Sequence, residues 1–155
     1  TMGARDPLER LRDARIDDVG GILALIEPLE ADGTLVKRSR ELLEMEIGRF
    51  AILEHDGVIA GCAALYPFAQ ERAGELACLA VHPDYRNSGA GDRLLRHIES
   101  QARAQSIRRL FVLTTRAAHW FVERGFVPTE VDALPQQKQQ LYNYQRNSQV
   151  FVKTL

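Results

Sequence analysis

Along this chain the spacing of apolar residues changes repeatedly between the period of a strand and that of a helix. Apolar and charged residues alternate at the start, which is typical of a strand, and Val19, Ile22 and Ile26 then follow the 3.6-residue period of a helix. Asp17 and Asp18 are candidate caps for that helix, and Ser39 is a candidate cap for the helix that follows it. The pattern predicts strands over 8–14, 50–55, 58–66, 75–81, 109–114, 126–131 and 150–155, and helices over 19–29, 40–47, 90–102 and about 117–124.

Turn residues separate these segments. Asp56-Gly57 lies between two β-rich runs and is a strong hairpin signal, whereas Pro67 is expected to end the second strand of that hairpin. Gly125 is expected to end the short helix before it as a left-handed residue. The glutamine-rich stretch 135–144 also contains proline, leucine and tyrosine, so we expect an ordered loop with one helical turn.

The order of elements predicts the fold class. Strands and helices follow one another as β-α-α-β-β-β-α-β-α-β-β, which indicates an α/β (α+β) chain with a mixed central sheet of six to seven strands and helices on both faces. At 155 residues, 45% of them hydrophobic, the chain is long enough for one domain over 1–155, with an ordered core over about 8–155.

Charge and cysteine content exclude several classes of function. The net charge of −1 provides no long-range attraction to nucleic acid or to an anionic membrane. Cys62 and Cys78 lie in apolar runs without metal-ligand neighbours, so we expect neither a zinc site nor a disulfide framework, and a reducing cytoplasm fits best. Because no apolar run approaches the length of a membrane span, no membrane partner is expected.

The segment after the strand 75–81 is suited to binding a phosphate. Gly89 and Gly91 allow the backbone to approach a ligand closely, and the first N–H groups of the next helix point toward it. Arg86 adds a positive charge beside them. The alternative is an ordinary strand-to-helix loop. A dinucleotide-binding fold is not favoured, because neither common motif, G-x-G-x-x-G or G-x-x-x-x-G-K-[ST], occurs in the chain.

The spacing R-x-x-G-x-G over 86–91 resembles the pyrophosphate-binding signature of the GNAT acetyltransferase superfamily. Nearly the whole chain resembles the acetyltransferase domain of the bacterial N-acetylglutamate synthases, in stretches such as G-E-L-A-C-L-A-V-H-P-D-Y-R, L-F-V-L-T-T-R-A-A-H-W-F-V-E-R-G-F and L-Y-N-Y-Q-R-N-S-Q-V. The resemblance implies the GNAT acyl-CoA N-acyltransferase fold. It also implies direct transfer of the acetyl group of acetyl-CoA to the α-amino group of L-glutamate, the first step of arginine synthesis.

Acetyl-CoA would bind at the strand 75–81 and the turn that follows it. The pantetheine arm would hydrogen bond to the exposed strand edge, and if the strand at Leu79 splays from the strand 109–114, its N–H could bind the developing oxyanion. No metal is expected to take part. The predicted coenzyme-binding residues are Leu79, Val81, Arg86, Asn87, Ser88, Gly89, Ala90 and Gly91.

Two residues are candidates for proton transfer. Glu75 opens the strand beside the expected thioester and could act as the base, although a solvated strand-end glutamate, or His82 or His119 as the base, remain alternatives. Many GNAT enzymes have a tyrosine where this chain has Phe121, so the leaving sulfur would rely on water, on release as free thiolate, or on Thr114, which stands where some relatives have a serine.

Several basic residues could bind a dicarboxylate, because guanidinium groups bind carboxylates in a two-pronged way. Scattered surface charge is the alternative. By the resemblance, glutamate would be bound by Arg38, Lys138, Arg146 and Ser148 and by the backbone of Cys78. Some relatives have arginine at the position of Lys138, and lysine keeps the charge but loses the two-pronged geometry.

Two other functions remain open: acetylation of another small amine or a peptide N-terminus, and non-catalytic acyl-CoA binding as a regulatory domain. The long relatives carry an N-terminal domain resembling amino-acid kinases, which binds arginine and builds the oligomer. Together with the start Thr1-Met2-Gly3, this suggests the C-terminal part of a longer chain. In that chain we expect a homo-oligomer regulated by arginine.

Overall fold

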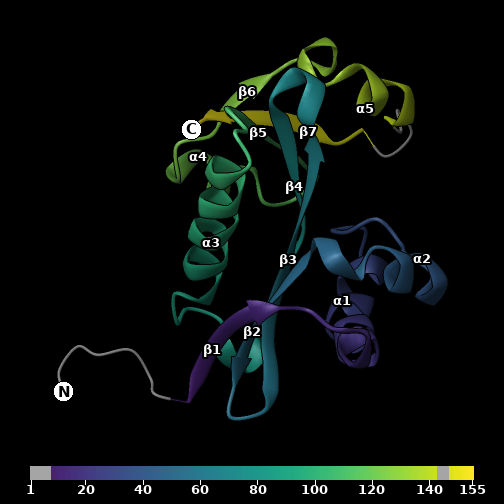
Figure 1. Cartoon of the computed structure of the whole chain (residues 1–155), viewed down its shortest axis with the longest axis vertical. Helices are drawn as coiled ribbons and strands as arrows, with labels where there is room; N and C mark the ends of the chain where they lie inside the picture. Colours follow the sequence, from purple (N-terminus) through teal and green to yellow (C-terminus); the bar gives the residue numbers. More distant parts are fainter. Residues whose placement is uncertain (1–7, 143–146) are drawn as a thin grey trace, which may run out of the picture. The chain divides into compact units, whose positions relative to one another are not determined.

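The computed structural model describes residues 8–142 and 147–155, and its seven strands form one sheet in the order β1-β2-β3-β4-β5-β7-β6 (Figure 1). Of the pairings described, β4–β5 is parallel, and β1–β2, β2–β3, β5–β7 and β6–β7 are antiparallel, which confirms the predicted mixed sheet. The strands are β1 (Glu9–Asp13), β2 (Phe50–His55), β3 (Val58–Phe68), β4 (Ala73–Val81), β5 (Arg109–Thr114), β6 (Val127–Thr129) and β7 (Gln149–Thr154).

Five α-helices connect these strands within the described residues: α1 (Val19–Ala31), α2 (Arg40–Met45), α3 (Ala90–Ala104), α4 (Ala118–Glu123) and α5 (Gln136–Leu141). The Ser39 hydroxyl accepts a hydrogen bond from Leu42 N at 3.1 Å, so Ser39 caps α2 as predicted. That helix is shorter than predicted, because residues 47–49 form a separate 3-10 turn. Strand β3 continues one residue beyond Pro67, and a proline so close to a strand end removes no interior hydrogen bond.

The chain divides into two compact units. Unit 1 contains the described residues before Leu65 together with Cys78–Ile98, and unit 2 contains Leu65–Ala77 and Glu99–Leu155. Strands β3 and β4 and helix α3 each contribute residues to both units. Across the two described ranges, no helix is long and apolar enough to cross a membrane.

In unit 1, an irregularity in β3 lets helices cover both faces of the sheet. Asp56 and Gly57 both have positive φ, 48° and 79°, as the predicted hairpin turn requires. The register then shifts between Leu53↔Gly61 and Glu54↔Ile59, which leaves one extra residue in β3 and interrupts the alternation of its side chains. Ile59 therefore reaches Gly21 of α1, whereas Gly61 lies under Leu94 of α3.

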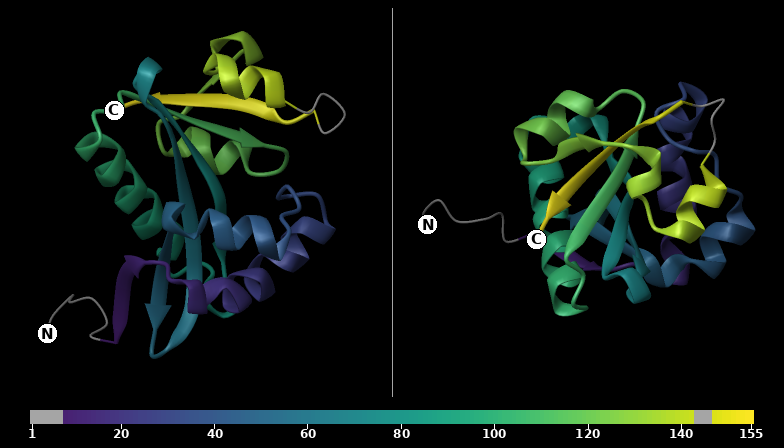
Figure 2. Two further views of the ribbon diagram at one scale, coloured as in Figure 1. Left: turned by 45° about the vertical axis from the view of Figure 1, so that its right-hand side comes forward. Right: turned by 90° about the horizontal axis from the view of Figure 1, so that it is seen from above.

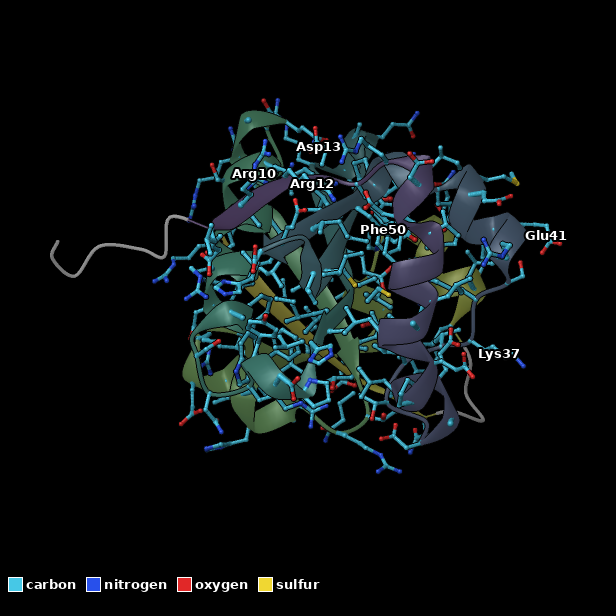
Figure 3. All side chains as sticks on the ribbon, turned by 90° about the horizontal axis from the view of Figure 1, so that it is seen from below. Arg10, Arg12, Asp13, Lys37, Glu41 and Phe50 are labelled. Atoms are coloured by element: carbon cyan, nitrogen blue, oxygen red, sulfur yellow. The ribbon has the colours of Figure 1, made fainter. Side chains whose placement is uncertain are left out.

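A network of charged side chains ties β1 to the start of α1. The guanidinium group of Arg12 donates to both carboxylate oxygens of Asp18, at 2.8 and 2.9 Å, and to Glu54 at 2.9 Å. Figure 3 shows where Arg12 lies on β1. Asp18 also accepts from Arg15 N at 2.7 Å. The prediction that Asp18 caps α1 is therefore wrong: its side chain makes no cap hydrogen bond to that helix, because its oxygens are bound to Arg12 and Arg15.

Unit 2 is built around β5. Strand β7 pairs with β5 along its whole length, from Arg109↔Thr154 to Thr114↔Gln149, and β6 pairs with the other edge of β7 (Figure 2). Gly125 has φ +94° directly after α4, as predicted. The buried core residues Ala73, Phe111, Leu134 and Val150 pack with partly buried neighbours that include Phe68, Val131 and Tyr142.

We predict that Gly61→Ala lowers the free energy of unfolding by about 1–3 kcal/mol, as overpacking of a dense core does. A Cβ at this position would lie 2.8 Å from Leu94 Cδ1 and 2.9 Å from the carbonyl oxygen of Ala80, which is backbone and cannot move aside cheaply. Urea unfolding measures the effect. Gly48→Ala is the matched control, because a Cβ there meets nothing within 4 Å, and equal losses in both variants would contradict this packing.

We further predict that Asp18→Asn destabilises the protein at neutral pH by about 1–3 kcal/mol, as loss of a hydrogen bond to a charged group does. The hydrogen bond from Arg12 holds the pKa of Asp18 below its usual value in spite of burial. A lowered pKa stabilises the fold above the pKa of the unfolded state, and this contribution disappears as pH falls through the folded value.

Urea unfolding at several pH values should therefore show that wild type and Asp18→Asn converge below about pH 4, the ordinary range of an aspartate. The control is Asp17→Asn, at the neighbouring exposed position, which should match wild type throughout. A difference between wild type and Asp18→Asn that stays constant down to low pH would contradict the role of the ion pair.

Candidate functional site

A left-handed residue lies within strand β4. Cys78 has φ +56°, a region that residues with a Cβ rarely adopt. Before this point β4 pairs in parallel with β5 over Ala73–Glu75. The predicted coenzyme-binding residues Leu79 and Val81 follow Cys78 in the same strand, and both are half-buried. The predicted use of Leu79 N–H at an oxyanion stays a prediction.

Two buried cysteines and an arginine lie together in unit 1. The thiol of Cys62 donates to the carbonyl oxygen of Cys78 at 3.4 Å. Interaction with Cys78, together with burial, raises the pKa of the Cys62 thiol. Interaction with Cys62 and the positive charge of Arg38 lower the pKa of the Cys78 thiol in spite of burial. Arg38 and Cys78, two of the residues predicted to bind glutamate, therefore lie close enough to interact electrostatically.

Two hydrogen bonds, one from its backbone and one from its side chain, fix the position of Arg38. Arg38 N donates to Glu30 at 2.8 Å, and the guanidinium group donates to the carbonyl oxygen of Val36 at 3.2 Å. Its side chain is half-buried, unlike the neighbouring Lys37, which is exposed and projects away from the ribbon (Figure 3). Of these two neighbouring cations, only Arg38 has the partly enclosed position expected of a ligand-binding side chain.

The predicted phosphate-binding turn has a concave backbone. Asn87 and Gly89 both have positive φ, 63° and 83°, immediately before α3 begins at Ala90. Alternation of left-handed with other residues points successive N–H groups to one side, and the first N–H groups of a helix have no partner within it. Arg93 supports the turn by donating to Ser88 O at 3.1 Å and to Glu9 at 2.8 Å. This backbone can hold a phosphate group.

A cavity of about 540 Å³ in unit 1 borders this region. One wall is the largely apolar face of α1, and another is the hairpin turn at Gly57 and the first residues of β3. Val81 at the end of β4 and the exposed Arg86, both predicted to bind the coenzyme, line the same cavity. Arg12 and Asp18 also line it, as the ion pair already described.

In unit 2, the candidate base is bound to a candidate substrate ligand. Lys138 Nζ lies 3.0 Å from Glu75 Oε1, and the side chains are only 22% and 13% exposed. Lys138 comes from α5, which Glu71 anchors by accepting from Gln136 N at 3.2 Å. The amide of Gln139 holds the same helix by donating to the carbonyl oxygens of Asp132 and Leu134. The sequence suggested both residues of this pair but not that they contact each other.

Ser148 and Thr114 are both buried, with 6% and 5% exposed surface. The hydroxyl of Tyr142 donates to Ser148 O at 2.5 Å. Thr114 Oγ1 accepts from Ala117 N at 2.9 Å and from Arg116 N at 3.3 Å, so it fixes the start of α4. A hydroxyl that accepts two hydrogen bonds still carries its own proton for donation. Arg146, also predicted to bind glutamate, lies outside the described residues.

Aromatic residues of α4 serve packing. Phe121 is buried and makes edge contacts with Trp120, at a centroid distance of 5.0 Å, and with Phe126, at 5.3 Å. The described residues include no group of three or more His, Cys, Asp or Glu side chains that could hold a metal ion.

The profile of the Acetyltransferase (GNAT) family matches residues 21–126, more than half of the chain. The chain belongs to this acetyltransferase family. Amino-acid acetyltransferases from Edwardsiella ictaluri and Ralstonia nicotianae are 63% and 59% identical over the whole chain. The chain spans about a third of their length, 35% and 34%.

Two solved structures of N-acetylglutamate synthase from Neisseria gonorrhoeae are similar over 98% of this chain. The complex with coenzyme A and N-acetyl-glutamate has a TM-score of 0.93 at 47% identity, and the chain covers 36% of it. The complex with coenzyme A and L-arginine has a TM-score of 0.87 at 46% identity, with 34% covered. The resemblance seen in the sequence, and the GNAT fold, are thereby confirmed.

The GNAT match ends before part of the candidate site. Residues 21–126 include Glu75, Thr114 and the turn 86–91, whereas Lys138 and Ser148 lie beyond it. The late segment is instead shared with the relatives that match over the whole chain. The family profile therefore covers the candidate coenzyme-binding turn but not the late segment that contains Lys138 and Ser148.

We predict that Thr114→Ala lowers the free energy of unfolding by about 1 kcal/mol, the usual net contribution of a hydrogen bond, because the N–H groups of Arg116 and Ala117 lose their acceptor. Thr114→Ser keeps the oxygen that accepts from Ala117 and should stay within a few tenths of a kcal/mol of wild type. Thermal unfolding of the two variants tests this. If Thr114→Ala proves as stable as Thr114→Ser, the hydroxyl does not fix the start of α4.

Proposed function

We propose that this chain transfers the acetyl group of acetyl-CoA to the α-amino group of L-glutamate, giving N-acetylglutamate by direct attack, without an acyl-enzyme. The observation that carries the proposal is the similarity over 98% of the chain to a synthase whose structure contains coenzyme A and N-acetyl-glutamate. The concave turn before α3 supports binding of the coenzyme's diphosphate, because its backbone is suited to an anion.

In this proposal Glu75 accepts the first proton from the α-ammonium group, since that group is not nucleophilic until it is neutral. The amine nitrogen then attacks the thioester carbonyl carbon, the C–N bond forms, the C–S bond breaks, and the coenzyme leaves as its thiolate. The nitrogen loses its second proton as the amide forms, and the thiolate takes up one proton to give the coenzyme thiol. Thr114 could return a proton to the sulfur, because its oxygen accepts from the backbone while its own hydrogen remains to be donated. Water is the other proton source.

Glutamate would be recognised through its two carboxylates. The residues that we assign to this role are Arg38, which is half-buried, Lys138, Ser148, the backbone of Cys78 and, outside the described residues, Arg146. Charge-assisted hydrogen bonds of this kind are the stronger ones in proteins, which suits recognition of a small charged substrate.

We also propose that the reaction is the first step of arginine synthesis, in the cytoplasm, within a longer homo-oligomeric chain that arginine regulates. The synthase complex with L-arginine and the greater length of the relatives support this context. Cys62 and Cys78 are free thiols in the structure, which is usual in reducing compartments.

The proposal predicts release of free coenzyme A thiol from acetyl-CoA with glutamate in clear preference to glutamine and lysine. Colorimetric detection of the thiol and mass spectrometry of the product measure this. Glu75→Gln should lower kcat by about 10²-fold or more, the usual contribution of a general base. The control is Glu123→Gln, on the exposed surface of α4, which should match wild type.

Two results would count against the proposal. Equal rates with the three amino acids would favour a GNAT enzyme for another amine. Binding of acetyl-CoA with no turnover in either this chain or its full-length protein would favour a regulatory domain.

A further inference from the structure

We propose that Glu75 and Lys138 form an exchangeable ion pair that only an amino acid with a side-chain carboxylate opens, so that the correct substrate releases its own base. This inference rests on the proposed acetylation of glutamate and deepens it. In this proposal Lys138 affects the rate of turnover as well as the binding of substrate. Part of the preference for an acidic amino acid would then appear as a higher kcat and not only as a lower KM.

The first step of the argument is the contact itself. Lys138 Nζ is 3.0 Å from Glu75 Oε1, and both side chains are largely removed from water. In contrast, the pair His119–Glu123 in the same unit is 88% and 56% exposed, and a pair of that kind has little effect. The Glu75–Lys138 pair is shielded from water. Separating the two groups would therefore leave each charge without a partner, which is energetically costly unless another charged group takes its place.

The second step concerns the base. Proton transfer to Glu75 neutralises its carboxylate and so removes the ion pair with Lys138. A base held in this way can accept the amine proton readily only if Lys138 receives another anion in its place. A substrate carboxylate is such an anion: Lys138 exchanges one carboxylate for another, and Glu75 becomes available to the amine.

The third step concerns geometry. Glu75 lies in β4 beside the ladder with β5, so it is fixed by the sheet. Lys138 lies on a six-residue helix that is held by side-chain contacts from Glu71 and Gln139. The long, flexible lysine side chain can therefore move between two acceptors while its helix stays in place. An amino acid with a neutral side chain, such as glutamine, offers it no second anion and leaves the pair closed.

The kinetic test compares Lys138→Met with wild type, using glutamate and glutamine at saturation. Methionine removes the charge and the donor but keeps much of the length. We expect kcat with glutamine to rise about tenfold, because hydrogen bonds to charged groups have free energies on that scale, while KM for glutamate rises. Lys138→Arg should restore the wild-type pattern. If kcat with glutamine in Lys138→Met is unchanged or falls, Lys138 is a carboxylate ligand only.

A matched control uses another shielded lysine pair of unit 2. Lys153 Nζ lies 2.7 Å from Glu99, with side chains 25% and 7% exposed. Lys153→Met should leave the ratio of glutamine to glutamate turnover unchanged. Thermal unfolding verifies that each variant is folded, and Lys138→Ala replaces Lys138→Met if the latter is not. A similar change of ratio in Lys153→Met would overturn the inference, since it would not be specific to the Glu75 pair.

A binding test needs no turnover. Glutarate has both carboxylates of glutamate but no amino group. It can therefore compete with Glu75 for Lys138, but it has no amine proton to transfer to Glu75. Glu75→Gln should bind glutarate about tenfold more tightly than wild type by calorimetry, because Lys138 no longer has to leave a charged partner. Unchanged or weaker binding would overturn the exchange. If wild type fails to acetylate glutamate at all, the proposed function itself fails, which the turnover assay shows separately.

Discussion

The left-handed backbone conformation of Cys78, a buried residue, constrains β4, the strand that contains the candidate base and two predicted coenzyme-binding residues. A residue with a Cβ in the left-handed region costs about 1–2 kcal/mol, so its surroundings must hold it there. Cys78 is almost fully buried, and its carbonyl oxygen accepts from the thiol of Cys62. Strand β4 nevertheless continues through this residue, and its buried and half-buried residues alternate on both sides of it. Along this strand Glu75 comes before Cys78, and the residues that lead to the coenzyme turn come after it, so the conformation of Cys78 must be held for β4 to keep its course.

The shielded ion pairs differ in how firmly their partners are held. Arg12 joins two carboxylates, and Asp18 joins the guanidinium group to a backbone N–H, so both of these residues have more than one bond. Glu75 and Lys138 instead connect a sheet strand with a six-residue helix. Helices this short are not stable alone, and α5 depends on Glu71 and Gln139 for its position. A pair with few supports can exchange partners, whereas the Arg12 network acts as a rigid brace.

Local signals in the sequence were enough for much of the fold. The turn at Asp56-Gly57, the cap at Ser39 and the end of α4 at Gly125 all follow from the preferences of single residues for particular backbone angles. The boundaries of β5 were predicted to the residue, because its apolar run is uninterrupted. These features do not depend on distant parts of the chain.

What the sequence did not predict depends on contacts between distant residues. Nothing in the neighbourhood of Cys78 favours a left-handed residue, and the extra residue of β3 follows from packing on two faces. Aspartate is a residue type that often caps helices. The carboxylate oxygens of Asp18, however, bind the guanidinium group of Arg12, six positions earlier, and not the N–H groups of α1. The contact of Glu75 with Lys138 joins positions far apart in the chain, and no local pattern indicates it. For the candidate site, residue types were therefore predictable but their partners were not.

The missing side chain at Gly61 has an effect beyond its own strand. It lets Leu94 of α3 come down onto β3, where any Cβ would collide with it. The first turns of α3 are thereby seated before any ligand arrives, and the guanidinium group of Arg93 braces the turn ahead of them. The backbone N–H groups that would bind a diphosphate are therefore fixed in direction before binding, and the protein would lose little conformational entropy on association. Gly61 would thus raise the affinity for the acetyl donor indirectly, through the position of α3.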